Sequence, residues 1–203
     1  MKFTVSEPNI IFKRIFEFFS ETIYVTENKR KEKRTTALKK LRRRGKKKMN
    51  ITLNEKEKNC VKDLADQEKL CIQKYEKYAS MAKDRVLCDL FTMIKSDEEK
   101  HLSSLNSLMS GTVSTDVNVN DNAGATYSPA ATYTGNYVQA DKDNDSFLCT
   151  DAITTEKYVS SAYNFDLFQF GSTEARKLLA DIEVEEQNHA EMMFRYKTVN
   201  SMC

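Results

Sequence analysis

The sequence predicts an all-α fold, an antiparallel four-helix bundle made of two helical hairpins joined by a long crossover. Three observations predict it. The 203 residues include only five Gly and two Pro, so long uninterrupted helices are allowed. Apolar residues recur at steps of three and four, as in Leu87, Leu90, Phe91 and Ile94. A shift of 88 residues aligns the second half of the chain with the first without a gap, which indicates that one hairpin is repeated.

The helix ends are marked by capping residues. Thr52-Leu-Asn-Glu55 fits a capping box at the start of the first helix. Asp84 and Ser172 are suitable N-caps for the second and fourth helices, and Gly111 follows the second helix where a C-terminal glycine is favoured. We therefore expect four helices, at residues 54–82, 85–109, 147–170 and 173–199.

Two segments fall outside these helices. Residues 110–145 are rich in Ser, Thr, Asn, Ala and Asp and have no helical periodicity, so we expect a flexible linker that forms the crossover. Residues 1–48 form a basic leader with 16 Lys and Arg against 5 Asp and Glu. The leader is interpreted either as a disordered tail or as upstream sequence translated from a mis-called start, with Met49 as the natural start. The predicted domain is then 49–203.

Charge and hydropathy exclude several classes of partner. The net charge of the whole chain is +2, whereas residues 49–203 hold 16 Lys and Arg against 25 Asp and Glu. An acidic domain repels phosphates, so no nucleic acid is expected as a partner. No run approaches the ~18 apolar residues of a membrane span. The chain also lacks a signal-peptide cleavage pattern, and its five scattered cysteines, without a C-x-x-C pair, are expected to be reduced thiols made in the cytoplasm.

The repeat brings together a set of acidic residues and histidines. Under the shift of 88, Glu68 aligns with Glu156, and the Glu-x-x-His of Glu98 and His101 aligns with that of Glu186 and His189. These are the only two histidines in the chain. In each hairpin, 16 residues separate the first Glu from the N-cap of the next helix, and 14 separate that N-cap from the second Glu. At 1.5 Å per residue the two arms are about 24 and 21 Å long, so a tight hairpin brings both Glu to one level.

This arrangement predicts a metal site in the middle of the bundle. One Glu from each of two helices and one Glu-x-x-His from each of the other two is the ligand set of ferritin-like di-iron and di-manganese proteins. Carboxylates can bridge two divalent ions and imidazole completes each coordination sphere, so two ions, iron or manganese, are the expected cofactors. The predicted metal ligands are Glu68, Glu98, His101, Glu156, Glu186 and His189.

Residues next to these ligands receive less specific predictions. Asp97, Glu99 and Glu185 are expected to support the ligands or to face solvent. Tyr75 and Tyr163, which also align under the shift, are expected to be core aromatics.

Four segments resemble the coat F family of spore coat proteins from endospore-forming bacteria: 66–75, 97–102, 149–158 and 185–189. The resemblance covers about 50–109 and 146–200, and the basic leader and polar linker depart from it. It implies a ferritin-like fold that carries the same six ligand positions. It also implies a location in the spore coat, with other coat proteins as partners. The sequence leaves the oligomeric state open, with a homo-oligomer as one alternative.

Two functions follow as alternatives. In the first, the protein is a component of the spore coat whose bundle carries a di-metal carboxylate site. In the second, the same site makes it a di-iron or di-manganese oxidoreductase, such as a ferroxidase, a peroxidase or a catalase-like enzyme. A complete ligand set is necessary for redox turnover but does not establish it, so whether the protein is an enzyme stays open at this stage.

Overall fold

A computed structural model describes residues 49–113 and 121–203 of the chain. The predicted leader, and part of the predicted linker, lie outside these residues. The described residues form one compact unit that is mostly helical, which confirms the all-α prediction. The unit contains four long helices: α2 (Glu55–Met81), α3 (Arg85–Met109), α5 (Gln139–Asp166) and α6 (Thr173–Val199).

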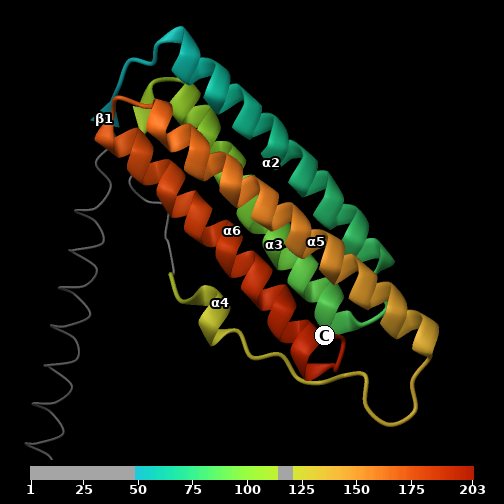
Figure 1. Ribbon diagram of the computed structural model, residues 1–203. Helices are drawn as coiled ribbons and strands as arrows, with labels where there is room; N and C mark the ends of the chain where they lie inside the picture. Colours follow the sequence, from blue (N-terminus) through green and yellow to red (C-terminus); the bar gives the residue numbers. More distant parts are fainter. Residues whose placement is uncertain (1–48, 114–120) are drawn as a thin grey trace, which may run out of the picture. The chain divides into compact units, whose positions relative to one another are not determined.

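The four long helices lie side by side as two hairpins (Figure 1). α2 and α3 form the first hairpin, and α5 and α6, joined through the short 3-10 helix η1 (Leu167–Gln169), form the second. Across the hairpins α2 packs on α5 and α3 packs on α6. Contacts between α3 and α6 join His101 to Glu185 and Asp97 to His189, so the residue numbers run in opposite directions. Each long helix is therefore antiparallel to its neighbours.

The starts of α2, α3 and α6 are fixed by side-chain capping. Asp84 accepts a hydrogen bond from the Val86 N–H at 3.0 Å, and Ser172 accepts one from the Ala175 N–H at 3.2 Å, as predicted. The predicted capping box was wrong by two residues: Asn54 is the N-cap of α2, and Glu57 closes the box. The reason is that Leu53 is buried in the core, so the chain enters the helix only after it.

The predicted start of the third long helix was also wrong. α5 begins at Gln139, eight residues before the expected start, and ends at Asp166, so the last residues of the expected linker 110–145 are helical. This first part of α5 has no apolar face and gave no periodic signal. It is held by polar contacts instead, such as the 2.7 Å hydrogen bond that Gln139 Nε2 donates to Asp143 and the helix-dipole interaction of Asp141 in the first turn.

The rest of the linker contributes two further elements within the described residues. The two-residue strand β2 (Thr112–Val113) pairs antiparallel with β1 (Met49–Asn50), in the register Met49 to Val113. The short helix α4 (Ala123–Thr126) packs on α6, where the Gly124 N–H donates a 2.9 Å hydrogen bond to Asn188. Gly111 takes the positive φ of 76° expected of a C-terminal glycine.

Each hairpin holds the turn of the other through a buried carboxylate. Asp145 on α5 accepts hydrogen bonds of 2.9 Å from the backbone N–H groups of Lys83 and Asp84, in the α2–α3 turn. Glu57 on α2 accepts one of 2.9 Å from the N–H of Gly171, in the α5–α6 turn. Glu57 and Asp145 are 88 residues apart, as are Lys83 and Gly171, so the internal repeat extends to these contacts. They fix the two hairpins relative to each other.

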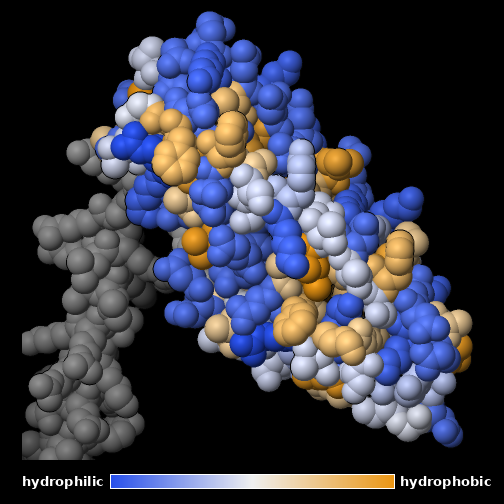
Figure 2. All heavy atoms as spheres, in the orientation of Figure 1, coloured by the Kyte–Doolittle hydropathy of each residue, from blue (hydrophilic) through white to orange (hydrophobic). Residues whose placement is uncertain are grey.

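The core lies between the four helices and is made of aliphatic and aromatic side chains. Among the largest fully buried are Tyr75, Tyr163, Tyr196, Phe91, Leu64, Leu87 and Ile94. The five cysteines are free thiols, and two of them, Cys71 and Cys149, are buried. Figure 2 shows mainly hydrophilic residues on the visible surface of the unit, with apolar residues scattered between them. Among the described residues, no helix is both long and apolar enough to cross a membrane.

Candidate metal centre

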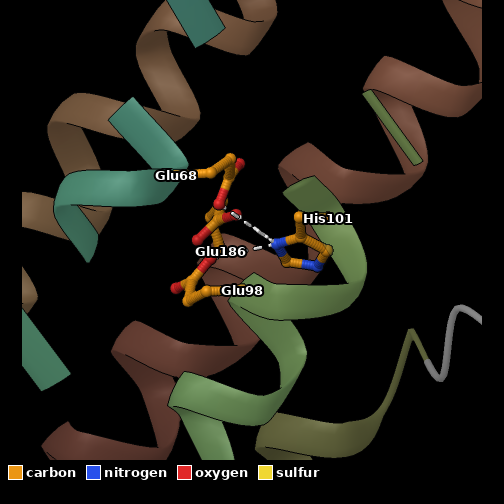
Figure 3. Close-up of side chains that lie close together, drawn as sticks. All are labelled: Glu68, Glu98, His101 and Glu186. Atoms are coloured by element: carbon orange, nitrogen blue, oxygen red, sulfur yellow. Dashed lines mark hydrogen bonds and ion pairs between the residues drawn. The ribbon is translucent and has the colours of Figure 1, made fainter. Parts of the chain in front are cut away.

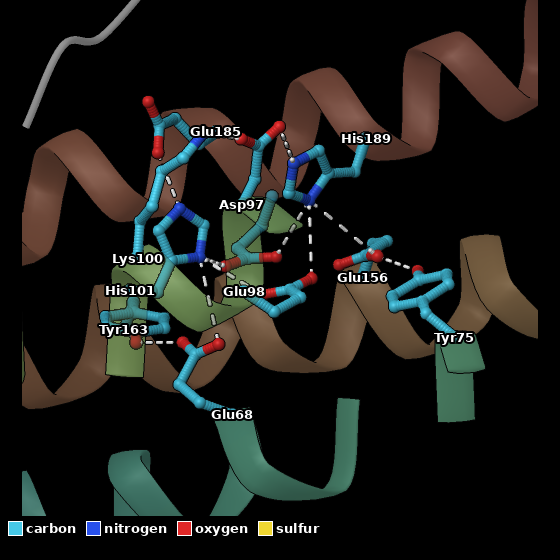
Figure 4. Close-up of polar contacts among 11 residues, drawn as sticks. Glu68, Tyr75, Asp97, Glu98, Lys100, His101, Glu156, Tyr163, Glu185 and His189 are labelled. Atoms are coloured by element: carbon cyan, nitrogen blue, oxygen red, sulfur yellow. Dashed lines mark hydrogen bonds and ion pairs between the residues drawn. The ribbon is translucent and has the colours of Figure 1, made fainter. Parts of the chain in front are cut away.

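The six predicted ligands converge in the middle of the four helices; Figure 4 labels five of them, and Figure 3 labels the sixth, Glu186. α2 and α5 each provide one Glu, and α3 and α6 each provide a Glu and a His one helical turn apart. All six side chains are buried, with the least buried, His189, at 2% exposure. Since isolated carboxylates and imidazoles are rarely buried, such a cluster requires partners of opposite charge. The residues are Glu68, Glu98, His101, Glu156, Glu186 and His189.

The cluster divides into two overlapping groups, each of which can hold a metal ion. We call them site 1, which contains Glu68 and His101, and site 2, which contains Glu156 and His189. Glu98 and Glu186 belong to both. Within each site, one ligand atom from each of the four residues lies within 4.8 Å of the others. Figure 3 shows site 1, where the three carboxylates and the imidazole point toward one another. Two shared carboxylates between two sites suit a pair of adjacent divalent ions.

Several buried atoms of the cluster have no hydrogen-bond partner, so they are free to bind a cation. They are Glu68 Oε2, Glu98 Oε1, Glu156 Oε2, both carboxylate oxygens of Glu186, and His189 Nδ1. The imidazole of His101 forms an ion pair with Glu186 Oε1 at 2.9 Å, but makes no hydrogen bond to that oxygen. An unpartnered buried polar atom costs about 1–3 kcal/mol. Divalent ions would satisfy all of these donor atoms, so the residues present fit a metal.

The two histidines have equivalent orientations. In both, Nδ1 faces the carboxylates of the cluster, at 3.1 Å from Glu98 for His101 and 3.4 Å from Glu98 for His189. In both, Nε2 faces an outer carboxylate, at 2.5 Å from Glu185 for His101 and 3.8 Å from Asp97 for His189. An outer carboxylate that accepts the Nε2 proton leaves the Nδ1 lone pair available to a metal. Of the three neighbours considered in the sequence, Asp97 and Glu185 contact the histidines, and Glu99 is exposed.

Two tyrosines support the carboxylates across the hairpins. Tyr75 on α2 donates its hydroxyl hydrogen bond to Glu156 on α5, and Tyr163 on α5 donates to Glu68 on α2. Both rings are fully buried, as expected of core aromatics, but the hydroxyl contacts were not predicted. The signal was present, because each Tyr follows the Glu of its own helix by seven residues. Seven residues are about two helical turns, which places both side chains on one face.

Burial and mutual charge set the protonation of the carboxylates. Burial, then the charges of neighbouring carboxylates, raises the pKa values of Glu68 and Glu156 well above the ordinary range. Burial acts in the same direction on Glu98 and Glu186, but the positive charges of the two nearby histidines outweigh it and lower both pKa values. In the metal-free cluster, Glu68 and Glu156 therefore hold a proton more tightly than Glu98 and Glu186 do.

The same interactions act on the histidines. Burial lowers the pKa of His101, but the charge of Glu186 and the hydrogen bond to Glu185 outweigh it and raise that pKa well above its ordinary value. Burial also lowers the pKa of His189, but Asp97 and Glu186 outweigh it and raise that pKa well above its ordinary value. For the carboxyl of Asp97, burial acts in the opposite sense and raises the pKa, but His189 and Lys100 outweigh it and lower that pKa to about 2. Both the outer carboxylates and those of the cluster thus favour the protonated form of the imidazoles.

No family model, curated protein or solved structure matches this chain. The centre is therefore characterised by its geometry, as a buried oxygen-rich and imidazole-containing cluster that can hold metal. Its donor types suit iron, manganese and similar divalent ions better than copper(I), which favours sulfur ligands.

Proposed function

We propose that the protein is a ferritin-like four-helix bundle that binds two divalent metal ions, iron or manganese, at sites 1 and 2. The observation that supports it best is the pair of overlapping ligand groups that share Glu98 and Glu186. A structural role for the carboxylates alone would leave several unpartnered buried atoms with no compensation. Metal ions provide that compensation.

The biological role that we propose is that of a spore coat-associated protein. It rests on the resemblance of four segments to the coat F family and on the all-α fold, which that resemblance also implies. Other coat proteins would be the partners, and the metal centre would contribute to the stability of the bundle. Immunogold labelling of spores from the source organism tests the location: label on the coat supports it, and label confined to the spore core or the mother cell contradicts it.

A second candidate function is a di-metal oxidoreductase. The favourable observation is the pair of shared carboxylates, because two adjacent ions can exchange two electrons with oxygen or peroxide. When bound, the metal pair would supply that redox chemistry. The chain would hold it through the six ligands, keep each imidazole in place through Asp97 and Glu185, and direct one phenolic proton toward each of Glu68 and Glu156.

One experiment separates the two functions. Purified protein is loaded with iron or manganese and assayed for ferrous oxidation and for peroxide removal, beside a Glu98→Ala variant. Turnover by the wild type that is lost in the variant supports the oxidoreductase. Bound metal without turnover supports a stabilising centre in a coat protein.

A further inference from the structure

Two partly exposed carboxylates connect the buried cluster to the surface between α3 and α6. The side chain of Asp97 is 30% exposed and that of Glu185 is 20% exposed. Their other edges contact His189 and His101, whose side chains are at most 3% exposed. Figure 4 shows Glu185 beside the imidazole of His101 and Asp97 beside that of His189. Because both carboxylates are partly exposed, each lies between solvent and one imidazole of the cluster.

The unpartnered atoms lie directly behind these imidazoles. His189 Nδ1 has no hydrogen-bond partner, and Glu98 Oε1, 3.4 Å from it, has none either. Both oxygens of Glu186 are also buried without a partner. A cation that passes the outer carboxylates thus meets fully buried donor atoms that have no competing hydrogen bond. The outer carboxylates therefore lie on a path from solvent to atoms that can bind the cation.

The opposite side of the cluster, between α2 and α5, is closed. The rings of Tyr75 and Tyr163 are fully buried there, and their hydroxyls are bound to the cluster. Further out, Lys74 forms a 2.5 Å ion pair with Asp151, which also accepts the hydroxyl hydrogen bond of Tyr78. Aromatic rings and a lysine are poor surroundings for a divalent cation, so this side does not offer a polar path.

We propose that divalent cations enter the centre between α3 and α6, and that Asp97 and Glu185 bind each arriving ion transiently before it reaches the six ligands. The inference rests on the proposed metal binding. It assigns a role to Lys100 as well: its ammonium lies 2.5 Å from Asp97 and its side chain is 71% exposed. Lys100 competes with the arriving cation for that carboxylate and slows entry.

Lys69 provides a matched control for Lys100. It is also on a surface helix, pairs with an aspartate three residues earlier, Asp66, at 2.7 Å, and is next to a cluster ligand, Glu68. It lies on α2, away from the α3–α6 side. Lys69→Gln and Lys100→Gln remove the same charge from the protein, so a difference between them reports the position of the lysine.

The test is a stopped-flow measurement of Co²⁺ uptake by the full-length protein after chelation, with a metal-indicator dye that reports free Co²⁺. We expect Lys100→Gln to take up Co²⁺ about threefold to tenfold faster than wild type, and Lys69→Gln to match wild type, because local charge changes the rate at which cations approach. Asp97→Asn should take up Co²⁺ more slowly than wild type, because it removes one of the two carboxylates that bind the arriving ion. Raising the salt concentration should slow the wild type and reduce the advantage of Lys100→Gln.

The outcomes distinguish the route from the metal site itself. Equal rates for Lys69→Gln, Lys100→Gln and wild type, with two Co²⁺ bound at equilibrium, would overturn the route and leave the metal centre intact. Faster uptake by Lys69→Gln alone would also overturn it. If wild type binds no Co²⁺ at equilibrium, both the route and the proposed metal binding fail.

Discussion

Metal binding should displace four protons from the cluster. In the metal-free protein the two histidines, Glu68 and Glu156 all have raised pKa values, whereas the two shared carboxylates have lowered ones. These directions favour cationic imidazoles, protonated Glu68 and Glu156, and ionised Glu98 and Glu186, an arrangement whose net charge is zero. Two divalent ions in place of four protons leave the net charge at zero, which is the state that burial favours.

The number of protons released differs clearly from the number expected if the six groups had ordinary pKa values. With ordinary pKa values the four Glu would be ionised at about pH 6, and only the imidazoles, partly protonated, would release protons, fewer than two in total. Isothermal titration calorimetry with Mn²⁺ in buffers of different ionisation enthalpy measures the number directly, as the slope of the observed enthalpy. Release of about four protons supports the protonation states inferred here. Release of two or fewer refutes them.

The same pKa shifts have a consequence for stability. A group with a raised folded-state pKa contributes stability at low pH and loses it as pH rises through that pKa. Four of the six groups are of this kind, so the melting temperature of metal-free protein should fall as pH rises above about 6. Saturating Mn²⁺ should abolish that fall, because its binding becomes stronger as the ligands deprotonate. Differential scanning calorimetry with and without metal would contradict the reasoning if both forms showed the same pH dependence.

Three further predictions concern the support of the fold and of the site. Asp145→Asn should lower the free energy of unfolding by about 2–4 kcal/mol in urea titrations, because it weakens the buried acceptor of two backbone N–H groups, and the exposed Asp143→Asn should cost less than ~0.5 kcal/mol. Gly111→Ala should destabilise more than Gly135→Ala: both have positive φ, but a Cβ at 111 would lie 2.7 Å from a backbone oxygen whereas one at 135 meets open space. Equal losses of stability in the two variants would show that the positive φ, and not the contact with the backbone oxygen, sets the cost. Asp97→Asn should weaken equilibrium Mn²⁺ binding by about tenfold to a hundredfold in calorimetric titrations, since it loosens the imidazole that it holds, and unchanged affinity would exclude that supporting role.

Most of the helical framework could be predicted because its signals are local. Asp84 and Ser172 are good N-caps and lie at the start of their helices, and the equal spacing around them placed Glu68 level with Glu98. The convergence of the six ligands followed from the repeat, since each hairpin has the same arm lengths.

The errors arose where the signal was not local. The first part of α5 is polar, and its one buried side chain, Asp145, binds the turn of the other hairpin, so periodicity could not reveal it. The hydroxyl contacts of Tyr75 and Tyr163 likewise cross from one hairpin to the other. Such contacts depend on the packing of distant segments. Within the sequence, the repeat of both tyrosines at 88 and their spacing of seven residues from a ligand Glu indicate only that they share a face with that ligand.

The measurement that most directly tests the metal centre is the number of Mn²⁺ or Fe²⁺ ions bound per chain, by mass spectrometry of metals in the purified protein. We expect two ions for wild type. Glu68→Gln, which alters site 1 alone, should retain one, and Glu98→Gln, which alters both sites, should retain fewer than Glu68→Gln. No ion in the wild type, or equal occupancy in both variants, would contradict a centre of two sites that share Glu98 and Glu186.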